Sequence, residues 1–176
     1  MSTTINVIRG NTTIYEVYYG ASRLLGTSTI DLSELNYNNI EISGAGILGD
    51  FNMVSPGMMD NLELTLHWRT IHRDLTLLGA PKAHTLTLRS AQNNYEAASG
   101  LLKVQPVKIV ARGLPQKTTL GKLEKAAETE SESTLNLDYI KVEVSGKVIL
   151  EYDKFNYVFK VNGTDYMKAT ATAVGR

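Results

Sequence analysis

The chain contains no cysteine, which excludes disulfide bonds, thiolate metal sites and cysteine nucleophiles. It also lacks an excess of charge, because 18 basic side chains balance 18 acidic ones and the formal net charge is +0. Proteins that grip nucleic acid draw most of their affinity from a basic excess, so sequence-specific nucleic-acid binding is disfavoured. No apolar run approaches the roughly 20 residues that span a bilayer, and the N-terminus lacks the pattern of a signal peptide. We therefore expect synthesis as a soluble protein of the cytoplasm.

Residue patterns that could carry catalysis are scarce. No Gly-x-Ser-x-Gly elbow, phosphate-binding loop or HExxH spacing is present. His67 and His72, with Asp74 nearby, could form a metal-binding triad, whereas His84 stands alone. Exposed or hydrogen-bonded histidines are favoured about ten to one, because a metal site needs further groups that orient its ligands. We expect no enzyme activity, no cofactor and no metal.

One short motif suggests nucleotide binding. Gly44-Ala-Gly46-Ile-Leu-Gly49 matches the G-x-G-x-x-G pattern and follows a predicted strand. A dinucleotide site needs the third glycine to open a helix, within a βαβ unit. Pro56-Gly57 would end any helix that began here, and the flanking pattern is that of antiparallel strands. A glycine hairpin is therefore favoured over a nucleotide site.

Alternation of apolar and polar residues dominates the chain, as in strands with one buried face. In the clearest strand, residues 62–69, the even positions are apolar and the odd positions are polar. Similar segments occur at 12–19, 36–42, 84–89, 104–112, 134–144, 147–152 and 157–161. The apolar phase changes within 134–144, which predicts a β-bulge near Tyr139. Ser145-Gly146, Asp153-Lys154 and Asn162-Gly163 are predicted turns, so the fold class is mainly β.

One helix and two irregular segments interrupt this pattern. Thr70 is a candidate N-cap, Ile71, Leu75 and Leu78 have helical spacing, and Gly79 suits the exit. Residues 43–57 combine four glycines and a proline with apolar side chains that need a partner, an unusual mixture for a surface loop. Residues 114–133 form a predicted polar excursion. Nothing divides residues 1–176 into more than one domain.

Several motifs in this order resemble the major tail tube protein family of contractile phages, which also builds the tubes of R-type bacteriocins. They are Gly44-Ala-Gly46, Asp60 to Arg69, Ala111-Arg-Gly113, Glu128-Thr-Glu-Ser131, Gly146 to Asp153 and Lys160 to Asp165. The resemblance covers most of residues 12–168. It implies a two-sheet antiparallel β-sandwich or barrel with one short flanking helix. Six copies would form a ring with a continuous inner β-barrel, as in type VI secretion tubes.

By this resemblance, residues 36–44, 58–69, 104–113 and 134–144 supply the inner barrel. The predicted lumen-facing residues are Glu41, Glu63, Thr65, His67, Lys108, Arg112, Asn136 and Asp138. The predicted inter-ring contact, in the extended loop 43–57, comprises Gly44, Gly46, Ile47, Leu48, Gly49, Phe51, Met53 and Val54. The implied partners are further copies of the chain, a surrounding sheath, a tape-measure protein and possibly DNA in the lumen, the baseplate and a tail terminator. The expected location is a virion or phage-tail-like particle.

Three other readings remain open from the sequence. A tube-terminating or secretion-tube component would share the barrel without open-ended stacking. A carbohydrate-binding β-sandwich would display exposed aromatic side chains, but Trp68, the single tryptophan, has an apolar-face position. A hydrolase would need a nucleophile with a base, and no such pair is found.

Overall fold

The computed structural model describes residues 7–24 and 27–176, which contain twelve strands and two short helices. The chain order is β1 (Val7–Tyr19), β2 (Ser22–Leu24), β3 (Thr27–Asp31), β4 (Tyr37–Ile42), β5 (Phe51–Met59), β6 (Leu62–Trp68), α1 (Arg73–Leu78), β7 (His84–Glu96), β8 (Leu101–Thr119), β9 (Ser131–Val144), β10 (Lys147–Asp153), β11 (Val158–Val161), β12 (Thr164–Asp165) and α2 (Lys168–Ala173). All strand pairs in these ranges are antiparallel. The predicted mainly β fold is confirmed.

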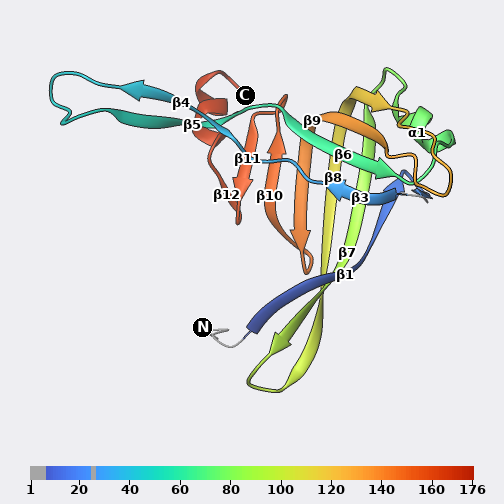
Figure 1. The fold of residues 1–176 in the computed structure, drawn as a ribbon. Coiled ribbons are helices and arrows are strands. Elements are labelled where there is room, and N and C mark those ends of the chain that lie inside the picture. Colours follow the sequence, from blue (N-terminus) through green and yellow to red (C-terminus); the bar gives the residue numbers. More distant parts are fainter. Residues whose placement is uncertain (1–6, 25–26) are drawn as a thin grey trace.

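Strand β9 is shared by two layers of a sandwich. Its first half pairs with β6, from Leu62 opposite Leu137 to Trp68 opposite Ser131. Its second half pairs with β10, and β8 lies along its other edge. The main sheet has the order β12-β11-β10-β9-β8-β7-β1-β2, while β6 and β3 branch from β9. In Figure 1 this branch crosses over β8, β7 and β1 at a steep angle, so the two layers enclose a core.

The β-bulge predicted near Tyr139 is confirmed, and it lies where β9 passes between the layers. Arg112 of β8 is opposite Tyr139, but the next residue, Gly113, is opposite Leu137, so Asp138 is the extra residue. A Cβ on Gly113 would lie 2.3 Å from the carbonyl oxygen of Asn136. Only glycine permits this close approach of β8 to the bulged strand.

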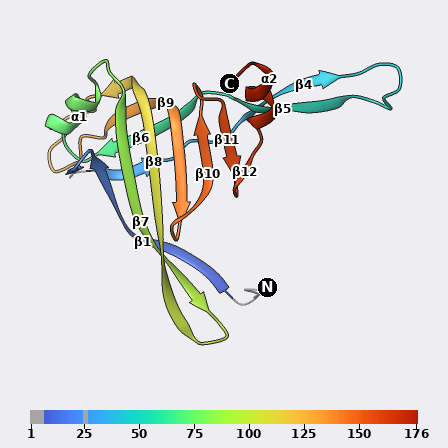
Figure 2. The ribbon, with the colours of Figure 1, turned by 180° about the vertical axis from the view of Figure 1, so that it is seen from behind.

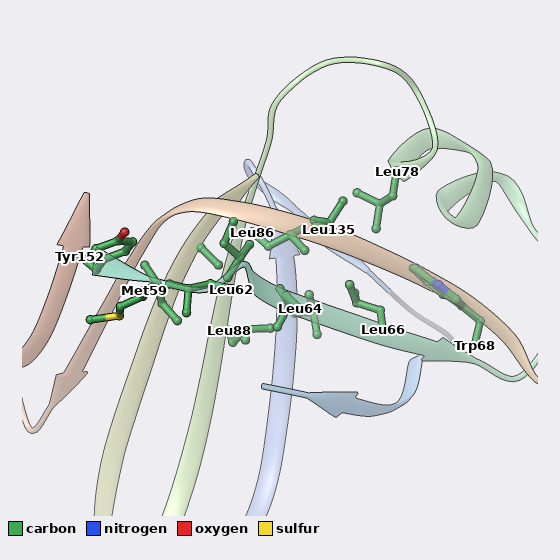
Figure 3. Packing of buried hydrophobic residues seen from close by; sticks show 14 of the residues in the cluster. Met59, Leu62, Leu64, Leu66, Trp68, Leu78, Leu86, Leu88, Leu135 and Tyr152 are labelled. Atoms are coloured by element: carbon green, nitrogen blue, oxygen red, sulfur yellow. The ribbon is translucent and has the colours of Figure 1, made fainter. Parts of the chain in front are cut away.

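The core is filled by the apolar face of β6 and the strands behind it. Leu62, Leu64, Leu66 and Trp68 are buried in alternation, as the sequence predicts. Figure 3 shows them packed against Leu86 and Leu88 of β7 and against Leu135 of β9. The burial of such side chains stabilises a domain by about 1.5–3 kcal/mol each. Trp68 also donates a hydrogen bond from Nε1 to the buried Ser133 hydroxyl at 3.1 Å.

Strands β7 and β8 are longer than predicted. They pair from His84 opposite Gly113 to Glu96 opposite Leu101, well beyond the predicted segments 84–89 and 104–112. Residues 90–96, 101–107 and the start of β1 (7–14) form a three-stranded extension, here called the arm, which leaves the body downward in Figure 1. At its other end β8 runs to Thr119, so residues 114–119 of the predicted excursion are strand.

The helices differ in part from the prediction. Helix α1 begins after His72, which is its N-cap and accepts a hydrogen bond at Nδ1 from the amide of Asp74 at 3.2 Å. Thr70 is therefore not the cap and Ile71 lies before the helix, while Leu75 and Leu78 are buried as predicted. Helix α2 was not predicted, because its sequence KATATA is short, polar and without a buried residue.

The turns follow local sequence. Ser145-Gly146 and Asn162-Gly163 are two-residue turns with positive φ at each residue, which matches the right-handed twist of a hairpin. The turn after Asp153 is longer than predicted, because Asp153 pairs with Val158 across four residues. The Asp153 carboxylate accepts hydrogen bonds from the amides of Phe155 and Asn156 and so fixes this loop.

Strands β4 and β5 form a separate two-stranded sheet, the hairpin, which projects from the body (Figure 1). The prediction that residues 43–57 lack regular structure is wrong for the second half of this segment, because β5 begins at Phe51, which is opposite Ile42. Only residues 43–50 connect the strands. Figure 2 shows α2 beside the base of the hairpin. There a Cβ on Gly57 would lie 2.5 Å from the Met167 sulfur.

Candidate assembly site

Seven of the eight predicted lumen residues lie on one continuous surface, the polar face, which is the side of the curved sheet opposite the core. Strand register places them together, because residues directly opposite in antiparallel strands share a face. Glu63 of β6 is opposite Asn136 of β9, and Lys108 of β8 is opposite Glu143 of β9. The polar face holds Glu63, Thr65, His67, Lys108, Arg112, Asn136 and, at the bulge, Asp138.

Glu41 is the exception. It lies on β4 opposite Asn52, in the hairpin that is not hydrogen-bonded to the main sheet. The implied barrel segment 36–44 is therefore not a neighbour of β6. That place belongs to β3, where Ile30 is opposite Leu66. The sequence did not predict β3, because a short polar run such as Thr27–Asp31 has no clear alternation.

On β6 the polar face is tied to its neighbours by side-chain hydrogen bonds. The Thr65 and Thr134 hydroxyls lie 3.0 Å apart, and Gln116 donates from Nε2 to Glu63 Oε1 at 2.9 Å. His67 lies between two carboxylates, with Nε2 2.8 Å from Asp31 Oδ2 and Nδ1 3.6 Å from Glu132 Oε1. These contacts hold β3, β6 and β9 in register at the edge of the sheet.

The bulge brings Asp138 to Arg112. The Arg112 Nε donates to Asp138 Oδ1 at 2.9 Å, and the guanidinium lies 5.6 Å from the centre of the Tyr139 ring. This hydrogen bond raises the pKa of Arg112 above its ordinary value. Burial, aided by the charge of Glu151, raises the pKa of the Tyr139 hydroxyl. Arg112 is thus a cation held by a carboxylate of the same face.

The lysines of the polar face are paired in the same way. Glu143 Oε1 lies 2.9 Å from Lys141 Nζ, and its Oε2 lies 3.5 Å from Lys108 Nζ. The hydrogen bond from Lys141 lowers the pKa of Glu143 and raises the pKa of Lys141. A face whose cations are paired offers few positive charges to the phosphates of a nucleic acid.

The hairpin carries the predicted inter-ring residues, and their apolar side chains are exposed. Phe51 is 55% exposed and Leu48 is 108% exposed, at the tip. Gly44, Gly46 and Gly49 have positive φ, and Ile47 donates its amide to the Gly44 carbonyl at 3.1 Å to close the turn. Ile47, Met53 and Val54 complete this apolar surface. The G-x-G-x-x-G motif therefore forms a hairpin tip and opens no helix.

The sequence did not identify a second exposed apolar surface, on the arm. It comprises Ile8, Ile14, Tyr95, Leu102 and Val104, each at least 40% exposed, while the exposed Leu101 lies on the opposite face. Residues 90–96 (SAQNNYE) are mostly polar, as in a loop, so the sequence did not predict that β7 and β8 pair in this region. Charged residues at the same place are paired, with Lys103 Nζ 2.6 Å from Glu96 Oε2.

The histidines of the described residues form hydrogen bonds and belong to no metal-binding group. No group of three or more histidine, aspartate or glutamate side chains in residues 7–24 and 27–176 is placed to hold a metal ion. His72 caps α1, and the buried His84 lies 3.2 Å from the Tyr19 hydroxyl and 3.0 Å from the Ala80 carbonyl. In the same ranges no helix is long and apolar enough to cross a membrane.

Known proteins share this architecture. A family model described as Phage tail tube protein FII matches residues 13–175, nearly the whole chain. The chain belongs to this tail tube family. Its resemblance to tail tube proteins, first seen in scattered motifs, is confirmed. No curated protein sequence matches the chain.

Two solved structures show the same fold as this tail tube family member. One is described as the sheath/tube terminator of PVC, an extracellular contractile injection system, in the extended state. It aligns with a TM-score of 0.53 and 13% identity, over 74% of this chain and 94% of that chain. The other is from the PVC sheath-tube complex, with a TM-score of 0.50 and 14% identity over 73% of this chain and 87% of that chain. At such low identity the likeness establishes the fold alone.

Proposed function

We propose that the chain is the structural subunit of the inner tube of a contractile tail, and that it is not an enzyme. Six copies form a ring, and rings stack into a hollow conduit that is driven through the target envelope. The family match over residues 13–175 carries this proposal. The particle is a virion or a phage-tail-like particle, assembled from subunits made in the host cytoplasm.

Unpaired strand edges support polymerisation. In the described ranges β3 is hydrogen-bonded to β6 alone, and β4 and β5 only to each other. Exposed edges invite pairing with other chains, and closure into a barrel removes them. Pairing of such edges between copies would join the sheets of six subunits into one inner barrel.

The polar face lines the lumen in this proposal. Its paired cations would let a tape-measure protein, or DNA, slide without being held, because each lysine or arginine paired to phosphate adds affinity. Replacing Glu63 and Thr65 by lysine adds two cations per subunit to this face. We expect the variant tube to slow or block passage of DNA, measured as DNA delivery by intact particles.

A matched control places two lysines elsewhere, at Glu124 and Ala127 in the exposed segment that follows β8. This pair changes the net charge as much as the test variant but outside the seven residues of the polar face, so delivery should be unchanged. Delivery that survives lysines at Glu63 and Thr65 refutes the charge argument for the lumen.

The hairpin joins one ring to the next. Substituting Ile47 and Phe51 by aspartate places two charges in the apolar surface of the hairpin, outside the buried core, at side chains that are 41% and 55% exposed. We expect a folded subunit, with unchanged circular dichroism, that no longer elongates in electron micrographs. Full-length tubes from this variant contradict the assignment. Ala83 and Ala127, both exposed and outside the hairpin, provide control sites for paired aspartates.

The other implied partners are the sheath outside the tube, the baseplate at one end and the tail terminator at the other. A second candidate is that the chain itself terminates the tube, because the PVC sheath/tube terminator shares its fold. Electron microscopy of the purified chain separates the two roles. A tube subunit forms rods of open-ended length, whereas a terminator forms single rings.

A further inference from the structure

The sandwich is open at one end, where its layers diverge. An apolar recess of about 380 Å³ lies there, which is within the range of about 300–1,000 Å³ that accommodates ligand-sized groups. Its apolar lining comes from both layers and comprises Tyr15, Ile30, Leu32, Leu88, Val107 and Ile109. Leu32 stands at the rim and is 52% exposed. This recess continues the core, since Leu88 belongs to the buried cluster and Ile30 and Ile109 pack against it.

The hairpin tip is an apolar projection on another part of the same chain. Leu48 is fully exposed at the turn, flanked by Gly46 and Gly49, whose φ values are both +93°. No other heavy atom outside the adjacent residues lies within 4 Å of the Cβ position at either glycine, so the tip is narrow. A two-stranded sheet is at best marginally stable alone in water, so the hairpin needs a surface to cover it.

The apolar area of the hairpin is large enough for a specific contact. Ile40, Ile47, Leu48, Phe51, Met53, Val54 and Met58 are each between 41% and 108% exposed. Together they present roughly 700 Å² over both faces of the hairpin, because Ile40 is opposite Met53 on one face and Val54 is opposite Asn39 on the other; a stable interface buries roughly 800 Å² per partner. Exposed apolar surface of this extent on a monomer marks an interaction site.

One charge also matches between the two surfaces. Residues 37–59 contain Glu41 and Asp50 and no basic residue. Below the recess, the same side of the arm carries a shallow polar depression lined by Arg9, Lys103 and Glu96, of which Lys103 is paired with Glu96 at 2.6 Å. Asp50 is two residues from Leu48, and Arg9 is three residues from Thr12 in the recess lining. A tip seated in the recess therefore brings the Asp50 carboxylate toward Arg9.

We propose that the recess receives the Leu48 tip of the hairpin from a second copy of the chain. This assignment rests on the proposed tube function and names the surface that accepts the hairpin. A projection and a recess at different places on one chain make a head-to-tail contact, which closes a ring or propagates a filament without a self-complementary patch. In this contact, side chains of one subunit's hairpin tip cover the open end of the core of the next subunit.

The absence of cysteine permits a direct cross-linking test. The double variant Leu32→Cys, Leu48→Cys places one thiol at the rim of the recess and one at the tip, and both positions are exposed. A disulfide forms only where two Cα atoms come within about 4.4–6.8 Å. After assembly into rods and oxidation with diamide, we expect most of the monomer band to move into a ladder of covalent multimers on a denaturing gel.

Three controls accompany it. Each single variant should stay monomeric on the gel, and so should Leu48→Cys combined with Leu123→Cys, which is 84% exposed in a distant segment. Rods without a ladder from the Leu32→Cys, Leu48→Cys variant overturn the recess assignment and leave the tube function standing. Cross-linking of the Leu32 thiol to a sheath or other protein in whole particles also overturns it. Failure of the unsubstituted chain to assemble refutes the tube function itself.

Discussion

Gly113 at the β-bulge offers the sharpest test of how the sheet is built. Alanine there would place its Cβ 2.3 Å from the Asn136 carbonyl oxygen and 3.0 Å from the Leu137 Cα. Both neighbours are backbone, so β8 and β9 must separate. Overpacking of this kind costs about 1–3 kcal/mol, and a weakened ladder hydrogen bond adds about 1 kcal/mol. We expect Gly113→Ala to lower the free energy of unfolding by roughly 2–4 kcal/mol.

The assay is urea denaturation of the unassembled subunit. Trp68 is the single tryptophan and is 1% exposed, so its fluorescence reports on the core. The control is Gly146→Ala, because Gly146 has a φ of +78° but no heavy atom within 4 Å of its Cβ position. That variant bears only backbone strain, about 1 kcal/mol. If Gly113→Ala is no more destabilising than Gly146→Ala, this result contradicts the close approach of β8 to β9 at the bulge.

Three further predictions concern the core and the polar face. Leu66→Ala should lower the free energy of unfolding by about 2–5 kcal/mol because the side chain is fully buried, and a loss under 1 kcal/mol in urea denaturation would contradict this packing. Tyr19→Phe removes the hydroxyl beside the buried His84 Nδ1 and should cost about 1–3 kcal/mol by the same assay, whereas an unchanged midpoint argues against that hydrogen bond. Lys141→Ala should raise the pKa of Glu143, seen by NMR titration of its carboxyl carbon. The pKa of Glu143 is lowered from 4.5 in the folded subunit, so its ionised carboxylate stabilises the fold above pH 4.5, and this stabilisation is lost as the pH falls through the lowered pKa. In the Lys141→Ala variant this loss of stability in acid should be smaller.

The parts of the fold that were predicted carry strong local patterns. Alternation in β6 predicted which side chains are buried, because a half-buried strand must place every second residue in the core. The change of apolar phase in β9 predicted the bulge, since an extra residue is the simplest way to keep both halves facing the core. Turn chemistry likewise predicted Asn162-Gly163, where both residues need positive φ.

The parts that were missed depend on pairing between distant segments. The arm exists because residues 90–96 pair with β1 and β8, although their own sequence is polar and loop-like. His72 caps α1 in place of Thr70, because side-chain geometry at the strand-to-helix junction decides the cap. Alternation placed the candidate lumen residues of β6, β8 and β9 on one face, whereas Glu41 lies apart from them because β4 pairs with β5.

Cryo-electron microscopy of the assembled chain at side-chain resolution tests the central claim most directly. The account predicts hollow rods built of six-membered rings, with Glu63, Thr65 and Arg112 facing the channel and the hairpin reaching the adjacent ring. Solid fibres, rods with this polar face turned outward, or a chain that stays monomeric in intact particles would contradict it.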